Sequence, residues 1–129
     1  MNNSLSENEI ATIVVDSCYH IHKELGPGLL ESIYEEILFD ELLEQRLDVT
    51  RQAIVPLEFR GKVYSKAYRT DLVVNNKVIL ELKSVETVLP VHQKTLLTYL
   101  RLMDLKLGLL INFNESLIKN GIQRIVNRL

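Results

Sequence analysis

Cysteine and tryptophan are almost missing from this chain of 129 residues, which contains one Cys and no Trp. A lone cysteine, Cys18, excludes an internal disulfide bond and favours a reducing compartment. Its place among the apolar residues of a predicted helix is typical of a small buried side chain rather than of a nucleophile. We therefore expect a cytoplasmic protein that depends on its hydrophobic core for stability.

Long hydrophobic runs, a leader pattern and an excess of positive charge are also lacking. No apolar run approaches the roughly 20 residues of a membrane-spanning helix, and residues 1–4 do not begin a signal peptide. The formal net charge is -2, from 15 Lys and Arg against 17 Asp and Glu. Proteins that coat nucleic acid without specificity are usually basic. An enzyme that binds a few phosphates locally remains compatible with this balance.

Helical patterns fill the first part of the chain. Ser6 and Glu9 have the spacing of a capping box, and apolar residues then recur at helical intervals as far as Gly26-Pro27-Gly28. Glycine and proline at this point predict the end of the helix. A second helix is predicted as far as about Arg46. The residues expected on its inner side are Leu30, Ile33, Tyr34, Ile37, Leu38 and Leu42.

Strand patterns follow. We predict strands over residues 52–59, 63–74 and 77–83, with tight turns at 60–62 and at Asn75-Asn76. A helix from Pro90 to about Met103, a doubly buried strand over 107–113 and an edge strand over 122–126 complete the chain. The order helix, helix, three meandering strands, helix, strand predicts a mixed sheet with helices packed on it. We expect one α/β (α+β) domain over residues 1–129.

Three ionisable residues on the second and third predicted strands form a candidate site. Glu81 and Lys83 lie two residues apart and leave the same face of the sheet, while Leu82 points into the core. Asp71 lies near the end of the preceding strand. Carboxylates that hold Mg²⁺ and a nearby lysine are what phosphodiester hydrolysis needs to activate water and stabilise charge. Taken alone, however, this spacing is more typical of a solvated sheet face.

The register of the turn at Asn75-Asn76 tests this interpretation. A two-residue hairpin loop would pair Val74 with Lys77 and turn Asp71 away from Glu81, because side chains alternate along a strand. A shared metal site therefore requires a three-residue loop or a β-bulge. Asparagine tolerates the left-handed conformation that such a loop needs. We predict one of these irregularities.

Ordered motifs along the chain are similar to those of a known family. Asp71 and Glu81-Leu82-Lys83 on neighbouring strands resemble the PD-(D/E)xK nuclease superfamily, and Gly28-Leu29-Leu30-Glu31-Ser32-Ile33-Tyr34 resembles the motif of the GxxExxY protein family. The likeness covers nearly the whole chain from about Val15. Its other parts are Arg51-Gln52, Tyr68-Arg69-Thr70-Asp71, Thr98-Tyr99-Leu100, residues 108–113 and Gly121-Ile122. The resemblance implies a restriction-endonuclease-like PD-(D/E)xK core.

The resemblance also implies roles for individual residues. Asp71, Glu81 and the main-chain carbonyl of Leu82 would bind the metal, Mg²⁺ or Mn²⁺. Lys83 would orient the attacking water or stabilise charge. Glu31 would be the helical acid that holds a water at the metal; a first-turn glutamate favoured by the helix dipole is the alternative interpretation.

Four further residues are expected at the substrate-binding part of the site. Arg69 is expected on the face of Asp71, where it binds a phosphate or pairs with Glu81. Tyr34 and Tyr99 are expected to pack over the site with their hydroxyls bonded into it. Thr95 stands where related sequences often carry a glutamine, so the amide that would contact water or phosphate is missing. Gln93 lies on another face of the helix. His92 is the alternative that would compensate for the missing amide, although a histidine at a helix start is more often merely exposed. His20 and His22 receive no role because neither has zinc-ligand spacing.

Three functions remain in competition. The first is a Mg²⁺-dependent nuclease that hydrolyses DNA or RNA through a metal-activated water, and the intact Asp71, Glu81 and Lys83 favour it. The second is a nuclease-fold protein that no longer cuts and serves in nucleic-acid or protein binding, which Thr95 and the net charge favour. A small nucleotide substrate is a third. A symmetric homodimer is also expected, since so small a domain offers little surface for a duplex.

Overall fold

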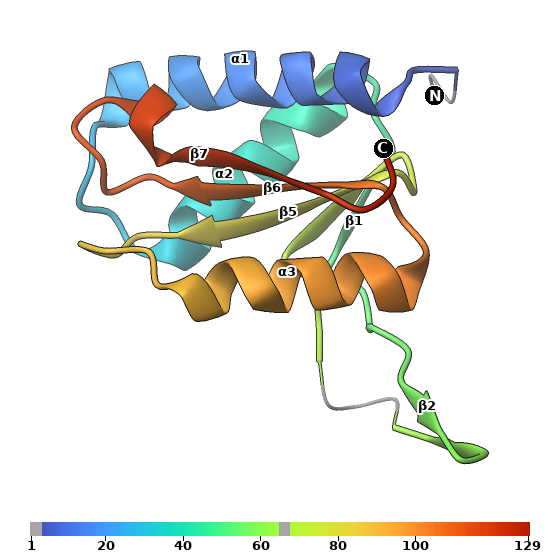
Figure 1. Cartoon of the computed structure of the whole chain (residues 1–129). Coiled ribbons are helices and arrows are strands. Elements are labelled where there is room, and N and C mark those ends of the chain that lie inside the picture. Colours follow the sequence, from blue (N-terminus) through green and yellow to red (C-terminus); the bar gives the residue numbers. More distant parts are fainter. Residues whose placement is uncertain (1–3, 65–67) are drawn as a thin grey trace.

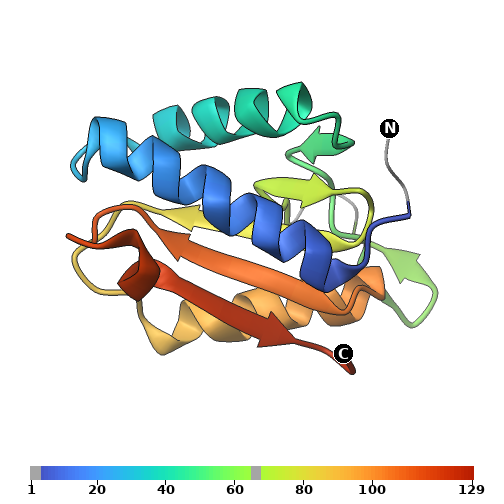
Figure 2. The same ribbon diagram turned by 90° about the horizontal axis from the view of Figure 1, so that it is seen from above.

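The computed structural model describes residues 4–64 and 68–129, and it has three layers. Two helices, α1 (Glu7–Leu25) and α2 (Glu31–Glu44), cover one face of a central sheet, and α3 (Pro90–Met103) covers the other (Figure 1). Seen from above, α1 crosses the middle of the sheet, and α2 lies next to α1 on the same face (Figure 2). The predicted α/β class with a mixed sheet is confirmed.

The ends of the helices follow the local sequence. Ser6 accepts a hydrogen bond from the backbone of Glu9, and the Glu9 carboxylate accepts one from the backbone of Ser6, so the predicted capping box is formed. Gly26 ends α1 with a φ of 68°, a conformation that favours glycine. Helix α3 begins at Pro90, as predicted, because proline in the first turn needs no N–H partner.

The main sheet contains β1 (Val49–Arg51), β4 (Leu72–Val74), β5 (Val78–Lys83), β6 (Leu107–Asn112) and β7 (Ile122–Val126), in the order β1-β4-β5-β6-β7. Strands β5 and β6 are parallel and are connected through α3, and the other neighbours are antiparallel. A short 3-10 helix, η1 (Ile118–Gly121), precedes β7. The last predicted strand is therefore confirmed at the edge of the sheet.

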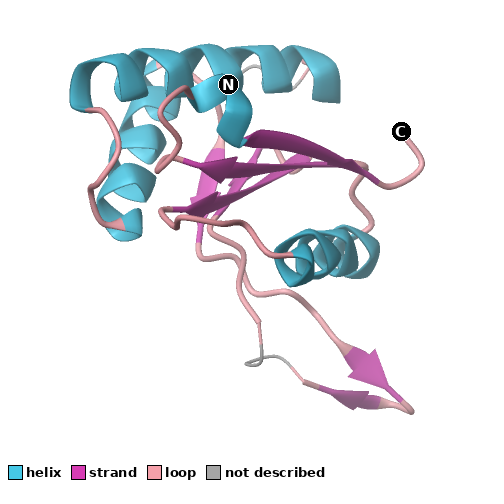
Figure 3. Cartoon of the chain, turned by 60° about the vertical axis from the view of Figure 1, so that its left-hand side comes forward, coloured by secondary structure: helices cyan, strands magenta, loops and turns pink. Residues whose placement is uncertain are grey.

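The predicted strand over 52–59 is wrong for most of its length. Gln52 has a φ of 52°, which bends the chain out of the sheet directly after β1, and Pro56 has no N–H to donate. Strands β2 (Glu58–Phe59) and β3 (Lys62–Val63) form a separate hairpin that extends away from the three layers (Figure 3). The predicted strand over 63–74 is likewise divided into β3 and β4, and its residues 65–67 lie outside the described chain.

The turn between β4 and β5 has the predicted irregularity. Val74 pairs with Val78, so three residues form the loop, and Asn75 and Asn76 have φ values of 52° and 53°. Leu72 pairs with Leu80 in the same register. One step further along this register, Asp71 lies opposite Glu81, and both side chains face α3.

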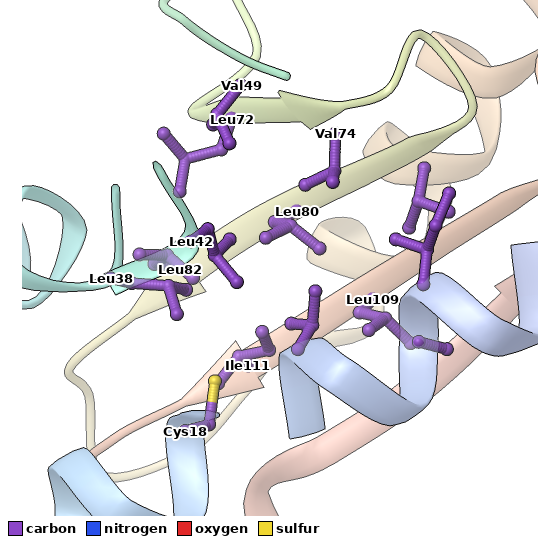
Figure 4. Packing of buried hydrophobic residues seen from close by; sticks show 14 of the residues in the cluster. Cys18, Leu38, Leu42, Val49, Leu72, Val74, Leu80, Leu82, Leu109 and Ile111 are labelled. Carbon is purple, nitrogen blue, oxygen red and sulfur yellow. The ribbon is translucent and has the colours of Figure 1, made fainter. Parts of the chain in front are cut away.

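The two faces of the sheet carry two hydrophobic clusters. The larger lies under α1 and α2 and includes Leu80, Leu82 and Leu109 (Figure 4). The smaller lies under α3, where Leu96 packs so close to β6 that a Cβ at Gly108 would lie 2.9 Å from it. Leu30 and Ile33, expected on the inner side of α2, are 73% and 40% exposed, because α2 begins beyond the edge of the cluster.

Candidate active site

A cavity of about 330 Å³ lies between the ends of β4 and β5 and the first turns of α3. It combines charged and aromatic side chains with an apolar floor. The lining residues are Arg69, Asp71, Glu81, Lys83, Val91, His92, Thr95, Leu96, Tyr99 and Leu110. The structure therefore brings six of the predicted site residues to one cavity: Arg69, Asp71, Glu81, Lys83, Thr95 and Tyr99.

Asp71 is held in place by the neighbouring strand. It directly precedes β4, and its carboxylate Oδ2 accepts a hydrogen bond of 2.8 Å from the backbone N–H of Leu82. A side chain thus replaces a backbone acceptor at this position of the sheet. The contact fixes the Asp71 carboxylate beside the main chain of β5.

The same contact shows where the Leu82 carbonyl points. The N–H and C=O groups of one strand residue leave the strand on the same side. The Leu82 N–H points toward Asp71, whereas the Lys83 carbonyl points the other way and accepts a hydrogen bond from Phe113 on the β6 side. The Leu82 carbonyl therefore faces Asp71, while the Leu82 side chain is fully buried in the larger cluster.

Glu81 is a carboxylic acid in an unfavourable environment for its charge. Burial and, after it, the negative charge of Asp71 raise the pKa of Glu81 from 4.5 to about 9. Its Oε1 atom is buried and has no hydrogen-bond partner in the described part of the chain. A buried unpaired acceptor is costly. A cation beside Asp71 and Glu81 would compensate both the charge and the missing partner.

Glu31 and Lys83 belong to the same electrostatic unit. Burial raises the pKa of Glu31, the positive charge of Lys83 opposes this shift, and the charges of Asp71 and Glu35 add to it. Glu31 lies in the first turn of α2, and the backbone of Ser84, the residue after β5, also acts to lower its pKa. The predicted acid on the second helix is therefore electrostatically coupled to the residues on the strands.

Tyr99 and Arg69 lie on opposite walls. Tyr99 is 9% exposed, and burial together with the negative charges of Glu81 and Asp71 raises the pKa of its hydroxyl. Its ring centre lies 6.0 Å from that of Tyr68. Arg69 lies two residues before Asp71, and its backbone forms an antiparallel β-bridge with that of Ile54. The Arg69 side chain is exposed and lines the cavity.

His92 lines the cavity, and the sequence offered it only as an alternative to the amide that Thr95 lacks. Its Nδ1 accepts a hydrogen bond from the backbone of Leu89 at the start of α3, which leaves Nε2 as the protonated nitrogen of the neutral ring. Burial and the charge of Lys83 lower the pKa of His92. The sequence signal for placing His92 at the site is its spacing from Thr95 and Tyr99, because the three residues fall on one stripe of α3.

Thr95 and Gln93 lie as the sequence indicated, on different faces of α3. Thr95 lines the cavity, whereas Gln93 is hydrogen-bonded to Gln123 of β7. No amide side chain is among the residues that line the cavity. The missing glutamine is therefore not replaced by Gln93.

Tyr34 is not at the cavity, and its predicted contact with substrate is corrected here. Its side chain is fully buried, its ring stacks on Phe113 with 4.3 Å between ring centres, and its hydroxyl donates to the carbonyl of Gly26. The hydroxyl also accepts a hydrogen bond of 3.2 Å from the backbone of Leu29. Tyr34 thus fixes the loop between α1 and α2 through these hydrogen bonds. The tyrosine lies on the inner side of α2, whereas Glu31 lies at the margin of that side.

A second polar cluster lies one turn after Glu31 on α2 and was not recognised in the sequence. The buried Glu35 lies one turn after Glu31, and its Oε2 is 3.1 Å from Nη2 of Arg51 and 3.2 Å from Nε2 of Gln52. These contacts join α2 to the end of β1. Arg51-Gln52 was noted only as a shared motif, because the partner on α2 follows from the tertiary structure.

The donor set fits a divalent cation that completes its shell with solvent. Asp71, Glu81 and the Leu82 carbonyl offer oxygen ligands, which Mg²⁺ and Mn²⁺ prefer. In the described residues no group of three His, Cys, Asp or Glu side chains is close enough to hold a metal by itself. Two carboxylates and waters are, however, a usual environment for Mg²⁺.

The comparison with protein families identifies the class. The chain matches the model of the PD-(D/E)XK nuclease superfamily over residues 8–125, and it belongs to that superfamily. Members of this superfamily typically use divalent metals and act on nucleic acid. In residues 4–64 and 68–129, no helix is both long and apolar enough to span a bilayer.

Two further comparisons add little. The chain has no match among curated proteins. Among solved structures it is similar to "Crystal structure of SSO0001", with 19% sequence identity, a TM-score of 0.47, and coverage of 93% of this chain and 79% of that one.

Proposed function

We propose that this protein is a Mg²⁺- or Mn²⁺-dependent nuclease that hydrolyses phosphodiester bonds of DNA or RNA. One observation carries the proposal: Asp71 and Glu81 lie opposite each other, and the buried Oε1 of Glu81 has no partner in the described structure. Two adjacent carboxylates without a cation are destabilising. An arrangement of this kind is explained by a bound cation rather than by stability.

Asp71, Glu81 and the main-chain carbonyl of Leu82 would hold the cation. A divalent ion at this place neutralises charge on the phosphate and increases the acidity of water. The hydrogen bond from the Leu82 N–H fixes the Asp71 carboxylate, so this ligand is oriented before the ion binds. Superfamily membership supports the class of reaction, and the residue roles are our assignment.

Lys83 and Glu31 would act on the attacking water. Lys83 shares the face of Glu81, and its positive charge acts to lower the pKa values of Glu31, Glu81 and His92. Its ammonium therefore lies among the ionisable groups of the site. We assign it to orienting the water and stabilising the charge that develops on the phosphate. Glu31, whose pKa responds to the charges of Lys83 and Asp71, would accept a hydrogen bond from that water.

Arg69, Thr95 and Tyr99 would contact the substrate. Arg69 is the exposed cation of the cavity wall and would bind a phosphate of the scissile strand. The Tyr99 hydroxyl and Thr95 lie on α3 opposite to it. We further assign the chain to the GxxExxY group, on the motif from Gly28 to Tyr34 and the position of Glu31 within it.

A second function is favoured by one observation. Thr95 lines the cavity where an amide is expected, and Gln93 is bonded elsewhere. A nuclease fold that binds nucleic acid without cutting would tolerate this change. The two functions differ in a measurable way, because only the nuclease requires Lys83.

A cleavage panel with Mg²⁺ and with Mn²⁺ on single-stranded, duplex and branched DNA and RNA tests the proposal. We expect Lys83→Ala to lower the cleavage rate by about 10² or more, while Lys94→Ala, an exposed lysine of α3, serves as the matched control. Calorimetry with Mn²⁺ should show binding that Asp71→Ala abolishes. A Lys83→Ala protein as active as the parent would point to a contaminating nuclease, and absent metal binding in the parent would reject the site.

A further inference from the structure

The β2–β3 hairpin, with residues 57–64 here called the arm, extends away from the layers beyond α3 (Figures 1 and 3). Its turn consists of Arg60 and Gly61, with φ values of 52° and 81°, the conformation of a tight two-residue hairpin. The backbone of Tyr64 donates to the carbonyl of Leu57 and continues the ladder. The arm is thus an ordered element without a hydrophobic core beneath it.

One face of the arm combines aromatic rings with positive charges. Phe59 pairs with Lys62, and Tyr64 lies two residues beyond Lys62, so these three side chains leave the same face. The guanidinium of Arg60 lies 5.0 Å from the centre of the Phe59 ring, and the ammonium of Lys62 lies 5.1 Å from the Tyr64 ring. Two cation–π pairs therefore stand side by side.

Both rings are exposed to solvent. Phe59 is 59% exposed and Tyr64 is 40% exposed. A cation stacked on one side of a planar ring leaves its other side available. The structure therefore displays two aromatic surfaces beside two positive charges, outside both hydrophobic clusters.

The charge of this face is complementary to a polyanion. Glu58, the acidic residue of the hairpin, pairs with Val63 and so lies on the opposite face. The face that carries Phe59, Lys62 and Tyr64 has no carboxylate of the arm. Since the whole chain has a net charge of -2, this concentration of positive charge is local.

The arm also leads to the candidate active site. The chain returns from it through Tyr68, whose ring contacts that of Tyr99, and through Arg69, which lines the cavity two residues before Asp71. Ile54 pairs with Arg69, and the backbone of Val55 donates to the carbonyl of Tyr68, so both chains of the connection are joined. A ligand along the arm would thus continue to the cavity.

We propose that the arm binds a single-stranded segment of nucleic acid, with bases stacked on Phe59 and Tyr64 and phosphates bound by Arg60 and Lys62. Stacking on aromatic side chains requires unpaired bases, since the faces of bases in a duplex are already covered by their neighbours. The inference rests on the proposed function for its choice of ligand, but it concerns binding and not cleavage.

Binding of fluorescein-labelled single-stranded DNA and RNA, and of a duplex of the same sequence, tests this in EDTA, where no cleavage occurs. Three double variants of the full chain are compared with the parent. Phe59→Leu with Tyr64→Leu removes the rings, and Arg60→Gln with Lys62→Gln removes the charges. Lys23→Gln with Lys119→Gln removes two exposed charges from α1 and η1 as the matched control. Thermal unfolding confirms that each variant is folded.

We expect the ring variant to bind single strands about tenfold more weakly or worse, with a smaller change for the duplex. For the charge variant, the slope of the logarithm of the binding constant against the logarithm of the salt concentration should decrease in magnitude by about 1.4. Each of the two lost phosphate contacts on a single strand contributes about 0.7 to this slope. The control should keep the parent's affinity for single strands more closely than either arm variant. DNA and RNA both support the proposal, and the tighter ligand identifies the source.

Several outcomes would overturn the assignment: a parent that binds no single strand, a ring variant with the parent's affinity, or an equal loss for the duplex. Arm variants that alter only the sedimentation of the chain would make the arm a contact between copies and likewise reject it. A parent that binds through the arm yet cuts nothing with Mg²⁺ or Mn²⁺ would reject the nuclease alone. A parent that cuts while its arm variants bind unchanged would reject the arm alone.

Discussion

The two faces of strand β5 differ in chemistry although their residues alternate along the same six positions. Val78, Leu80 and Leu82 point toward α1 and α2 and belong to the larger apolar cluster. Ile79 on the other face belongs to the smaller cluster under α3, but Glu81 and Lys83 on that face are charged. One face is apolar to the end of the strand, and the other changes from core to candidate active site.

The comparison shows how a small domain separates stability from chemistry. The hydrophobic cluster on the α1–α2 face contains no ionisable group of the proposed site, and Glu31 lies at the start of α2 outside this cluster. On the α3 face, Asp71 and Glu81 raise the free energy of the metal-free protein, because burial and like charge disfavour the ionised form of Glu81. The first face stabilises the fold that holds the second in place. Substitutions on the two faces should therefore have different and separable effects.

Leu80→Ala gives the largest expected effect on stability. Leu80 is fully buried in the larger cluster, and loss of a buried leucine side chain costs about 2–5 kcal/mol of the free energy of unfolding. The adjacent Glu81→Gln should instead stabilise the metal-free protein at neutral pH, because folding no longer requires the uptake of a proton that the unfolded chain has released from Glu81. Urea unfolding in EDTA measures both. A Leu80→Ala protein as stable as the parent would break the distinction between the faces.

The pH dependence of stability sharpens the comparison. The folded protein holds the Glu81 proton up to a pKa of about 9, whereas the unfolded chain releases it near 4.5. Between these values the folded state binds more protons, so the free energy of unfolding falls as pH rises, by at most about 1.4 kcal/mol per pH unit. The raised pKa of Glu31 acts in the same direction. This stability is fully present below pH 4.5 and is lost as pH rises through about 9.

The matched variant for this titration is Glu81→Gln, in which most of the slope should disappear. Unfolding in EDTA at a series of pH values provides the measurement, and Leu80→Ala, which lowers stability without removing a titrating group, should keep the parent's slope. Identical slopes for the parent and Glu81→Gln would mean that Glu81 titrates normally.

A pair of tyrosines gives the smallest effect. Tyr34→Phe should lower the free energy of unfolding by about 1 kcal/mol, because the carbonyl of Gly26 and the N–H of Leu29 lose their partner. Tyr99→Phe should leave stability nearly unchanged and reduce cleavage, since its hydroxyl lies in the cavity wall. Chemical unfolding and a cleavage assay on both variants decide this, and the reverse pattern would return Tyr34 to the site.

Local signals predicted much of the fold. The capping box at Ser6, Pro90 at the start of α3 and the alternation of leucine with charge in β5 depend on neighbours in sequence, and each is confirmed. The predicted strand over 52–59 is wrong because the left-handed conformation of Gln52 and the missing N–H of Pro56 outweigh the β-forming side chains around them. Chain direction at those residues is set by backbone conformation, which the apolar pattern does not report.

The candidate site shows the same division. The spacing of Asp71, Glu81 and Lys83 was a weak signal by itself, and the resemblance to a nuclease superfamily strengthened it. The need for an irregular turn at Asn75-Asn76 followed from the alternation of side chains. Tyr34 was misplaced, since one helical stripe contains both Glu31 at the margin and Tyr34 at the centre. Its burial is decided by the packing of Phe113, which lies far away in sequence.

By itself, the sequence determined the class of fold, the alternation that places Glu81 and Lys83 on one face, and the loop needed to bring Asp71 beside them. These follow from strand periodicity and from the conformations that asparagine and glycine tolerate. Only the tertiary structure decided that Oε1 of Glu81 is buried without a partner in the described residues, that His92 joins the cavity and that the arm leaves the sheet. Burial and electrostatic coupling depend on segments distant in the chain, which local patterns do not bring together.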